Sequence, residues 1–240
     1  ILGGQWAYEE LGWGGFWAWD PVENAALMPW LTGTAFLHSV MIQEKRNMLR
    51  IWNVVLIITT FGLTIIGTFL TRSGIINSVH SFTQSEIGPA FLVYLALVLI
   101  AGFALLFKRI QMLESDYKIE SVLCRENVFL AQNILLVGIA FTVLLGTTFP
   151  LLAEAVRGTK LSIQAPFFNT ITAPMGYALL VLMGIGMLIS WRRSSLDNLR
   201  RNFQNPLIIA TLGTIILVWL LFEKSLSWGV YIIFWSTIFV

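Results

Sequence analysis

Seven long apolar segments restrict the possible folds of this chain more than any other feature of its sequence. They lie at approximately 25–42, 52–71, 90–107, 128–152, 176–191, 207–222 and from Trp228 onward. Most of them approach the roughly 20 residues that a helix needs to cross a bilayer. Backbone groups in lipid must form their hydrogen bonds within the segment, which favours helices over strands. We therefore predict an all-α fold, a polytopic integral membrane helical bundle that forms one membrane domain over residues 1–240.

The composition supports a membrane protein and excludes other classes. Of the 240 residues, 57% are hydrophobic and 12% are charged, about half the charged fraction of a soluble domain. The net charge of +2 does not indicate a nucleic-acid partner. Cys124 is the single cysteine, so the chain has no internal disulfide and cannot carry out dithiol chemistry alone. Because the sequence starts at Ile1 and its last apolar segment is short, we expect a central fragment of a larger protein.

Loops rich and poor in lysine and arginine alternate along the chain. The rich loops are 43–51, 108–127 and 192–206, and the poor loops are 72–89 and 153–175. Since cytoplasmic loops carry an excess of basic residues, the rich loops should face the cytoplasm. The poor loops should then face outward, together with residues 1–24.

The segment 12–21 reads GWGGFWAWDP, and half of the 10 tryptophans lie in the first thirty residues. Large rings provide contact area at a small entropic cost, and glycines let a ligand approach the backbone. An aromatic belt at the membrane interface is the alternative, but a belt distributes its rings over every helix end. Five tryptophans cluster at the start of one helix, namely Trp6, Trp13, Trp17, Trp19 and Trp30. We therefore predict a binding surface for a large flat ligand, a macrocycle or a quinone.

The residues after this segment predict the start of a helix. Asp20 precedes Pro21, which suits the first helical position, and Glu23 stands at the capping-box spacing from Asp20. Capping explains both acids without any ligand contact, and this alternative stays open beside a role in binding. Pro29 lies inside the predicted helix and should kink it.

The chain contains two histidines at different membrane depths. His38 lies roughly 20 Å along the first apolar helix, and an ionisable group inside a membrane suggests function. A neutral imidazole that is hydrogen-bonded to a neighbouring helix is the alternative. His80 lies in the outward loop 72–89 among apolar residues, where it could meet the tryptophans as an axial haem ligand or remain an ordinary surface histidine. The two cannot bind one iron together, so two ligand roles would require two haems, each with a second ligand from outside this chain.

Three blocks of sequence resemble one family. Residues 12–24 with 28–31 resemble the WWD signature of the CcmF family, the haem lyases of cytochrome c maturation, and blocks at 67–82 and 167–174 resemble the same family in the same order. The resemblance is close over the first 90 residues and looser beyond them. Phe16 stands where the family usually has tryptophan. Stacking should survive this change, whereas any indole hydrogen bond from this position is lost.

The resemblance implies a multi-pass protein of the bacterial inner membrane whose WWD segment, residues 1–24, faces the periplasm. Such proteins receive haem from a periplasmic haem chaperone of the CcmE type and attach it by thioether bonds to the CxxCH motif of apocytochrome c. The implied partners are this chaperone, apocytochrome c with its CcmH-type thiol-presenting subunit, membrane lipid and, as a candidate electron donor, quinol. The chain needs no catalytic residue of its own, because the reacting thiols belong to the apocytochrome.

The resemblance also assigns residues. His80 is expected to bind the iron of a transient haem at the WWD segment, and His38 the iron of a transmembrane haem b that reduces the substrate haem. The other expected haem contacts are Trp13, Gly14, Gly15, Trp17, Trp19 and Asp20. Arg72 is a candidate partner of a haem propionate, because a guanidinium matches carboxylate geometry. An interfacial arginine that extends toward water is the alternative.

Two other functions stay open from the sequence. One is a related assembly factor dedicated to nitrite-reductase cytochromes, which would share the signature but serve another apoprotein. The other is a non-enzymatic haem transporter or a quinone-binding redox subunit. The third to sixth apolar segments carry almost no internal charge, which argues against a polar transport path.

Overall fold

The computed structural model describes residues 2–10, 17–73, 87–115, 121–158, 163–221 and 227–239. These residues form eight α-helices and one 3-10 turn, and no strand occurs among them. The elements are α1 (Leu2–Glu10), α2 (Pro21–Arg46), α3 (Arg50–Arg72), α4 (Gly88–Lys108), η1 (Ile110–Leu113), α5 (Arg125–Arg157), α6 (Ala165–Leu188), α7 (Leu196–Leu220) and α8 (Trp228–Phe239). Six of the described helices, α2 to α7, are long and apolar enough to cross a membrane. The prediction of an all-α polytopic membrane protein is confirmed.

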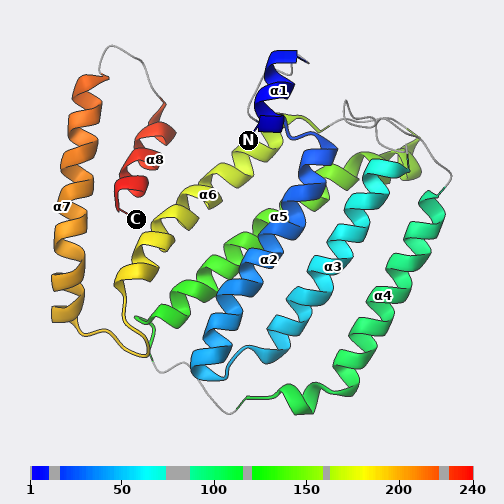
Figure 1. Cartoon of the computed structure of the whole chain (residues 1–240), viewed down its shortest axis with the longest axis horizontal. Coiled ribbons are helices and arrows are strands. Elements are labelled where there is room, and N and C mark those ends of the chain that lie inside the picture. Colours follow the sequence, from blue (N-terminus) through cyan, green and yellow to red (C-terminus); the bar gives the residue numbers. More distant parts are fainter. Residues whose placement is uncertain are drawn as a thin grey trace.

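The helices α2 to α8 lie side by side in one layer, in the order α4, α3, α2, α5, α6, α8, α7 (Figure 1). Contacts between α2 and α5 bring together two helices that are far apart in the sequence. We call the end of the layer where α2 begins the Trp19 end, and the opposite end the Arg46 end. Many apolar side chains of α4 and α7, the two outermost helices of the layer, are exposed.

The core lies along the contacts of α3 with α2, of α2 with α5, and of α5 with α6. Its buried side chains include Met28, Leu31 and Ala35 from α2, Leu56 and Leu63 from α3, Leu136 and Val143 from α5, and Phe168 from α6. Pro29 lies inside α2 and has no N–H, so the carbonyl of Ala25 lacks its usual helical partner. Gly67 of α3 faces this carbonyl, and a Cβ there would lie 3.2 Å from the oxygen. A glycine at this position lets the two backbones approach closely.

Two expected loops are largely helical. The predicted extent of the outward loop 153–175 was wrong, because α5 continues to Arg157 and α6 begins at Ala165. Proline is accepted in a helical first turn, where Pro166 lies, and neighbouring membrane helices tolerate the internal Pro174. The connection 192–206 was also too long, since α7 begins at Leu196. The polar first turn of α7 follows Ser195, which caps the helix. The Ser195 side-chain oxygen accepts the N–H of Asn198 at 3.2 Å.

The alternation of basic loops matches the arrangement of the helices. The α2–α3 and α6–α7 connections lie at the Arg46 end, and the described parts of the α4–α5 connection lie there too (Figure 1). All three are the loops that the sequence identified as basic. Which end faces the cytoplasm stays a prediction.

Candidate functional site

The start of α2 has the predicted capping box. The Asp20 carboxylate accepts the N–H of Val22 at 2.9 Å, and Oε2 of Glu23 accepts the N–H of Asp20 at 3.2 Å. The same Glu23 oxygen accepts the N–H of Ala18 at 3.0 Å. Capping therefore accounts for both acids, and a contact of Asp20 with a ligand would be additional to it.

Trp19 is packed against α6. Its ring stacks on Phe168, with centroids 4.9 Å apart and planes 11° apart. Its indole N–H donates to Oδ1 of Asn169 at 2.7 Å, and its carbonyl accepts from the side chain of Asn24 at 3.1 Å. One ring face and the N–H are thus engaged within the protein. Phe168 and Asn169 belong to the third block of the family resemblance, but the sequence did not predict this contact.

Trp17 presents more of its ring than Trp19 does. Its side chain is 38% exposed and packs edge-on against Trp19, with centroids 5.9 Å apart and planes 87° apart. Arg72 is also exposed, in the last turn of α3, which ends at the Trp19 end of the layer (Figure 1). The expected contacts Trp13, Gly14, Gly15 and His80 lie outside the described residues.

His38 lies in the other half of α2, two turns before Arg46. Its ring stacks on Phe129 of α5, with centroids 5.3 Å apart and planes 14° apart. Phe129 in turn meets Trp191 edge-on, and the guanidinium of Arg125 lies 5.4 Å from the centroid of Trp191. This aromatic row fixes the plane of the imidazole. Nδ1 of His38 is buried and has no hydrogen-bond partner among the described residues, which does not support the alternative of a hydrogen bond to a neighbouring helix.

The half of the layer nearer the Arg46 end contains further buried polar groups. Ser39 is fully buried, and Gln132 and Asn133 of α5 are nearly so. Each has at least one side-chain atom without a hydrogen-bond partner among the described residues. Such groups are costly inside a membrane. They lie on the parts of α2 and α5 around His38.

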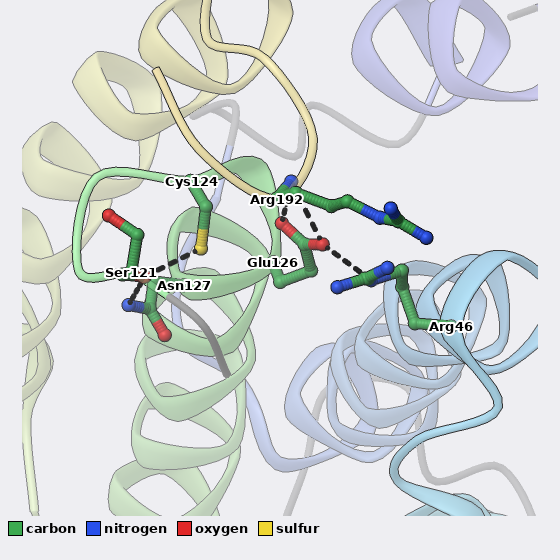
Figure 2. Close-up of polar contacts among 6 residues, drawn as sticks. All are labelled: Arg46, Ser121, Cys124, Glu126, Asn127 and Arg192. Atoms are coloured by element: carbon green, nitrogen blue, oxygen red, sulfur yellow. Dashed lines mark hydrogen bonds and ion pairs between the residues drawn. The ribbon is translucent and has the colours of Figure 1, made fainter. Parts of the chain in front are cut away.

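A buried charge cluster joins the helices at the Arg46 end (Figure 2). Nε of Arg46 lies 3.0 Å from Oε1 of Glu126, and both side chains are nearly buried. Both carboxylate oxygens of Glu126 also accept the backbone N–H of Arg192 at 3.1 Å. Nearby, the Cys124 thiol donates to the carbonyl of Ser121 at 3.0 Å. The sequence did not predict this cluster; the only signal was an acidic residue in the first turn of an apolar helix.

The described residues contain no group of three or more histidine, cysteine or acidic side chains that could hold a metal ion. Histidine is a common ligand of haem iron, and His38 is the one histidine among the described residues. The geometry therefore allows a haem-binding protein with a tryptophan-lined surface at one end of α2 and a half-buried histidine in its other half.

These features define a multi-pass helical membrane protein, and comparisons with known proteins identify its relatives. A family model described as "Cytochrome C assembly protein" matches residues 1–76. The "Cytochrome c-type biogenesis protein ccl1" of Rhodobacter capsulatus is 43% identical over 221 residues, which cover 92% of this chain and 34% of the relative. The "Probable cytochrome c-type biogenesis protein NrfE" of Escherichia coli is 40% identical over 202 residues, which cover 83% of this chain and 36% of that protein.

A solved structure agrees with these relatives. The "Cytochrome c Heme Lyase CcmF" matches with a TM-score of 0.73 and 35% identity, over 100% of this chain and 34% of the solved chain. The chain belongs to the CcmF family of cytochrome c biogenesis proteins. It spans about a third of the length of the relatives that it matches.

Proposed function

We propose that this chain is the haem-handling part of a haem lyase, which attaches haem covalently to apocytochrome c. The observation that carries the proposal is the anchored WWD segment, in which Trp17 stays open to a ligand beside the fixed ring of Trp19. The family membership and the name of the solved relative, a haem lyase, support the same activity. The chain would lie in the bacterial inner membrane with its Trp19 end facing the periplasm.

At the Trp19 end, haem is the substrate. A CcmE-type chaperone would deliver it, His80 would bind its iron, and Trp17 with Trp13, Gly14 and Gly15 would contact its faces and edge. Arg72 would pair with a propionate from the same end of the layer. Each thiol of the apocytochrome then adds its sulfur and its hydrogen across a haem vinyl double bond, a step that needs no net oxidant or reductant. The protein contributes the positioning of two reactants, which can supply many powers of ten in rate.

The half of α2 nearer the Arg46 end has features that suit a transmembrane haem b. His38 is held in a defined plane by Phe129, and its half-exposed ring has a buried nitrogen without a protein partner among the described residues. A haem b bound here would supply electrons to the substrate haem, with quinol as the candidate donor. His38 would contribute one axial ligand, and the aromatic row would keep its imidazole oriented.

A nitrite-reductase assembly factor is the second candidate function, because a relative of that name is 40% identical to this chain. The two candidates differ in the apocytochrome that they serve. Co-purification of the full-length protein with one apocytochrome or the other separates them. A CcmH-type subunit that presents the thiols would be a partner in the haem lyase.

The test is the visible spectrum of the purified full-length protein beside His38→Ala, His80→Ala and the control Thr34→Ala. Thr34 lies one turn from His38, and its hydroxyl donates to the Trp30 carbonyl of its own helix at 2.8 Å. We expect His38→Ala to remove a constitutive, reducible b-type band that Thr34→Ala retains. We expect His80→Ala to keep that band but to lose the capture of chaperone-delivered haem. Unchanged haem content in both histidine variants would overturn the proposal, and haem capture without thioether attachment would favour a transporter.

A further inference from the structure

Trp19 has an unusual backbone conformation. Its φ is 58°, in the left-handed region that bulky side chains adopt rarely and at a cost in free energy. Such a residue persists where its surroundings determine it strongly. The tertiary contacts of Trp19 therefore hold its backbone in a conformation that the residue by itself disfavours.

Three helices provide the contacts that hold Trp19. From α6, Phe168 stacks on the ring and Asn169 accepts its N–H. From α2, the side chain of Asn24 donates to the Trp19 carbonyl and, at 3.0 Å, to the hydroxyl of Thr147 in α5. Asn24 is 1% exposed, so this bridge lies inside the layer. The ring and the carbonyl of Trp19 are thus fixed from different sides.

Gly146 of α5 makes room for this arrangement. A Cβ at Gly146 would lie 2.5 Å from the Phe168 ring, closer than any real side chain allows. Phe168 is 2% exposed and also meets Phe167 edge-on. The ring on which Trp19 stacks is therefore held rigidly against α5 and cannot be displaced cheaply.

The residues around Trp19 are fixed as well. Glu23 binds the backbone N–H groups of Ala18 and Asp20, so residues 18–20 are tied at every position. Trp17 directly precedes this fixed stretch, and its exposed ring packs edge-on against Trp19. The orientation of Trp19 therefore sets the place from which Trp17 reaches a ligand.

We propose that Trp19 is a positioning residue, which α5 and α6 hold in a left-handed conformation so that it directs Trp17 toward haem. The inference deepens the proposed function and rests on it for the identity of the ligand. It divides the signature tryptophans into an anchor, Trp19, and a ligand contact, Trp17. It also gives α6 a role in haem capture through Phe168 and Asn169, although neither residue needs to touch haem.

The test compares full-length Asn169→Leu, Asn169→Asp and Asn205→Leu with the wild type. Leucine removes the acceptor of the indole N–H at similar volume, whereas aspartate keeps an acceptor oxygen. Asn205 is exposed on α7 and controls for the loss of an asparagine side chain elsewhere. Two readouts are the rate of chymotrypsin cleavage after Trp17 and Trp19 without haem, and the capture of added haemin at the Trp19 end. The constitutive b-type band reports that the helices remain folded.

We expect Asn169→Leu to raise the cleavage rate roughly fivefold, as the loss of one hydrogen bond allows, and to lower haemin capture with the b-type band unchanged. Asn169→Asp and Asn205→Leu should behave as the wild type. An unchanged cleavage rate in Asn169→Leu would contradict the anchoring of Trp19 by Asn169. Faster cleavage with full haemin capture would contradict the positioning role of Trp19. If the wild type itself captures no haemin, the proposed function fails instead, and the cleavage rates still decide whether Trp19 is anchored.

Discussion

The Arg46 guanidinium and the Glu126 carboxylate form a nearly buried ion pair, 3.0 Å from Nε to Oε1, that joins the end of α2 to the first turn of α5 (Figure 2). Glu126 also accepts the backbone N–H of Arg192, in the α6–α7 connection. Three segments that are distant in sequence thus meet at one carboxylate. This contact lies two turns of α2 beyond His38 and fixes α2 against α5 on that side.

Glu126→Ala should destabilise the protein by about 3 kcal/mol, because it removes the buried carboxylate that pairs with Arg46 and accepts the backbone N–H of Arg192. Arg46→Met should cost less, since the Arg192 N–H keeps its partner. The free energy of unfolding in detergent micelles measures both, and the double variant Arg46→Met with Glu126→Met should recover part of the loss. Equal costs for the two single variants would contradict the role of Arg192.

Gly146→Ala should destabilise the protein by about 1–3 kcal/mol, because its Cβ would overlap the Phe168 ring. Gly176→Ala in α6 is the matched control, since a Cβ there meets nothing within 4 Å. That control should stabilise the protein by about 0.5–1 kcal/mol through helix propensity. Thermal unfolding followed by circular dichroism distinguishes the two, and similar midpoints for both alanine variants would show that the site can relax.

Asp20→Asn separates the two roles that the sequence left open for this carboxylate. Asparagine caps a helix about as well as aspartate, whereas Asp20→Ala should cost about 1 kcal/mol. If capping is the role of Asp20, Asp20→Asn should keep both the stability and the haemin capture of the wild type. A loss of haemin capture in Asp20→Asn at unchanged stability would instead assign the negative charge to the ligand.

Cys124 should resist alkylation in the folded protein. The side chain is 1% exposed, and burial raises the pKa of its thiol above the ordinary value, so less reactive thiolate is present at neutral pH. We expect maleimide labelling at neutral pH to be at least about tenfold slower than after unfolding. Val122→Cys in a Cys124→Ser background is the control, because Val122 is 83% exposed. Rapid labelling of native Cys124 would show that this turn opens readily.

Much of the fold was predictable from local patterns. Apolar length located six spanning helices, and the Asp20–Glu23 spacing located the start of α2 with its cap. The predicted starts of α6 and α7 were wrong because the first turns of these helices carry prolines, polar residues or arginines. Their helical state depends on caps and on packing against neighbouring helices, which the count of apolar residues does not register.

The candidate site was predictable in its residue types and not in their contacts. The tryptophan cluster and His38 within the first apolar segment follow from the sequence, since indoles and an imidazole are conspicuous in a membrane protein. The engagement of Trp19 by Phe168 and Asn169, which are about 150 residues away, depends on how α6 lies beside α5 and α2. No local pattern carries that information.

The sequence by itself determined that this chain is a membrane protein of helices, where α2 begins, which loops are basic and which aromatic and ionisable side chains are available for haem. Those properties follow from hydrophobicity, propensity and charge along short stretches of chain. Only the tertiary structure decided that Trp19 is an anchor while Trp17 remains exposed, that His38 is stacked on Phe129, and that Arg46 pairs with Glu126. Each of these contacts joins separate helices, and helix order and register in the layer arise from close packing of side chains over the whole bundle.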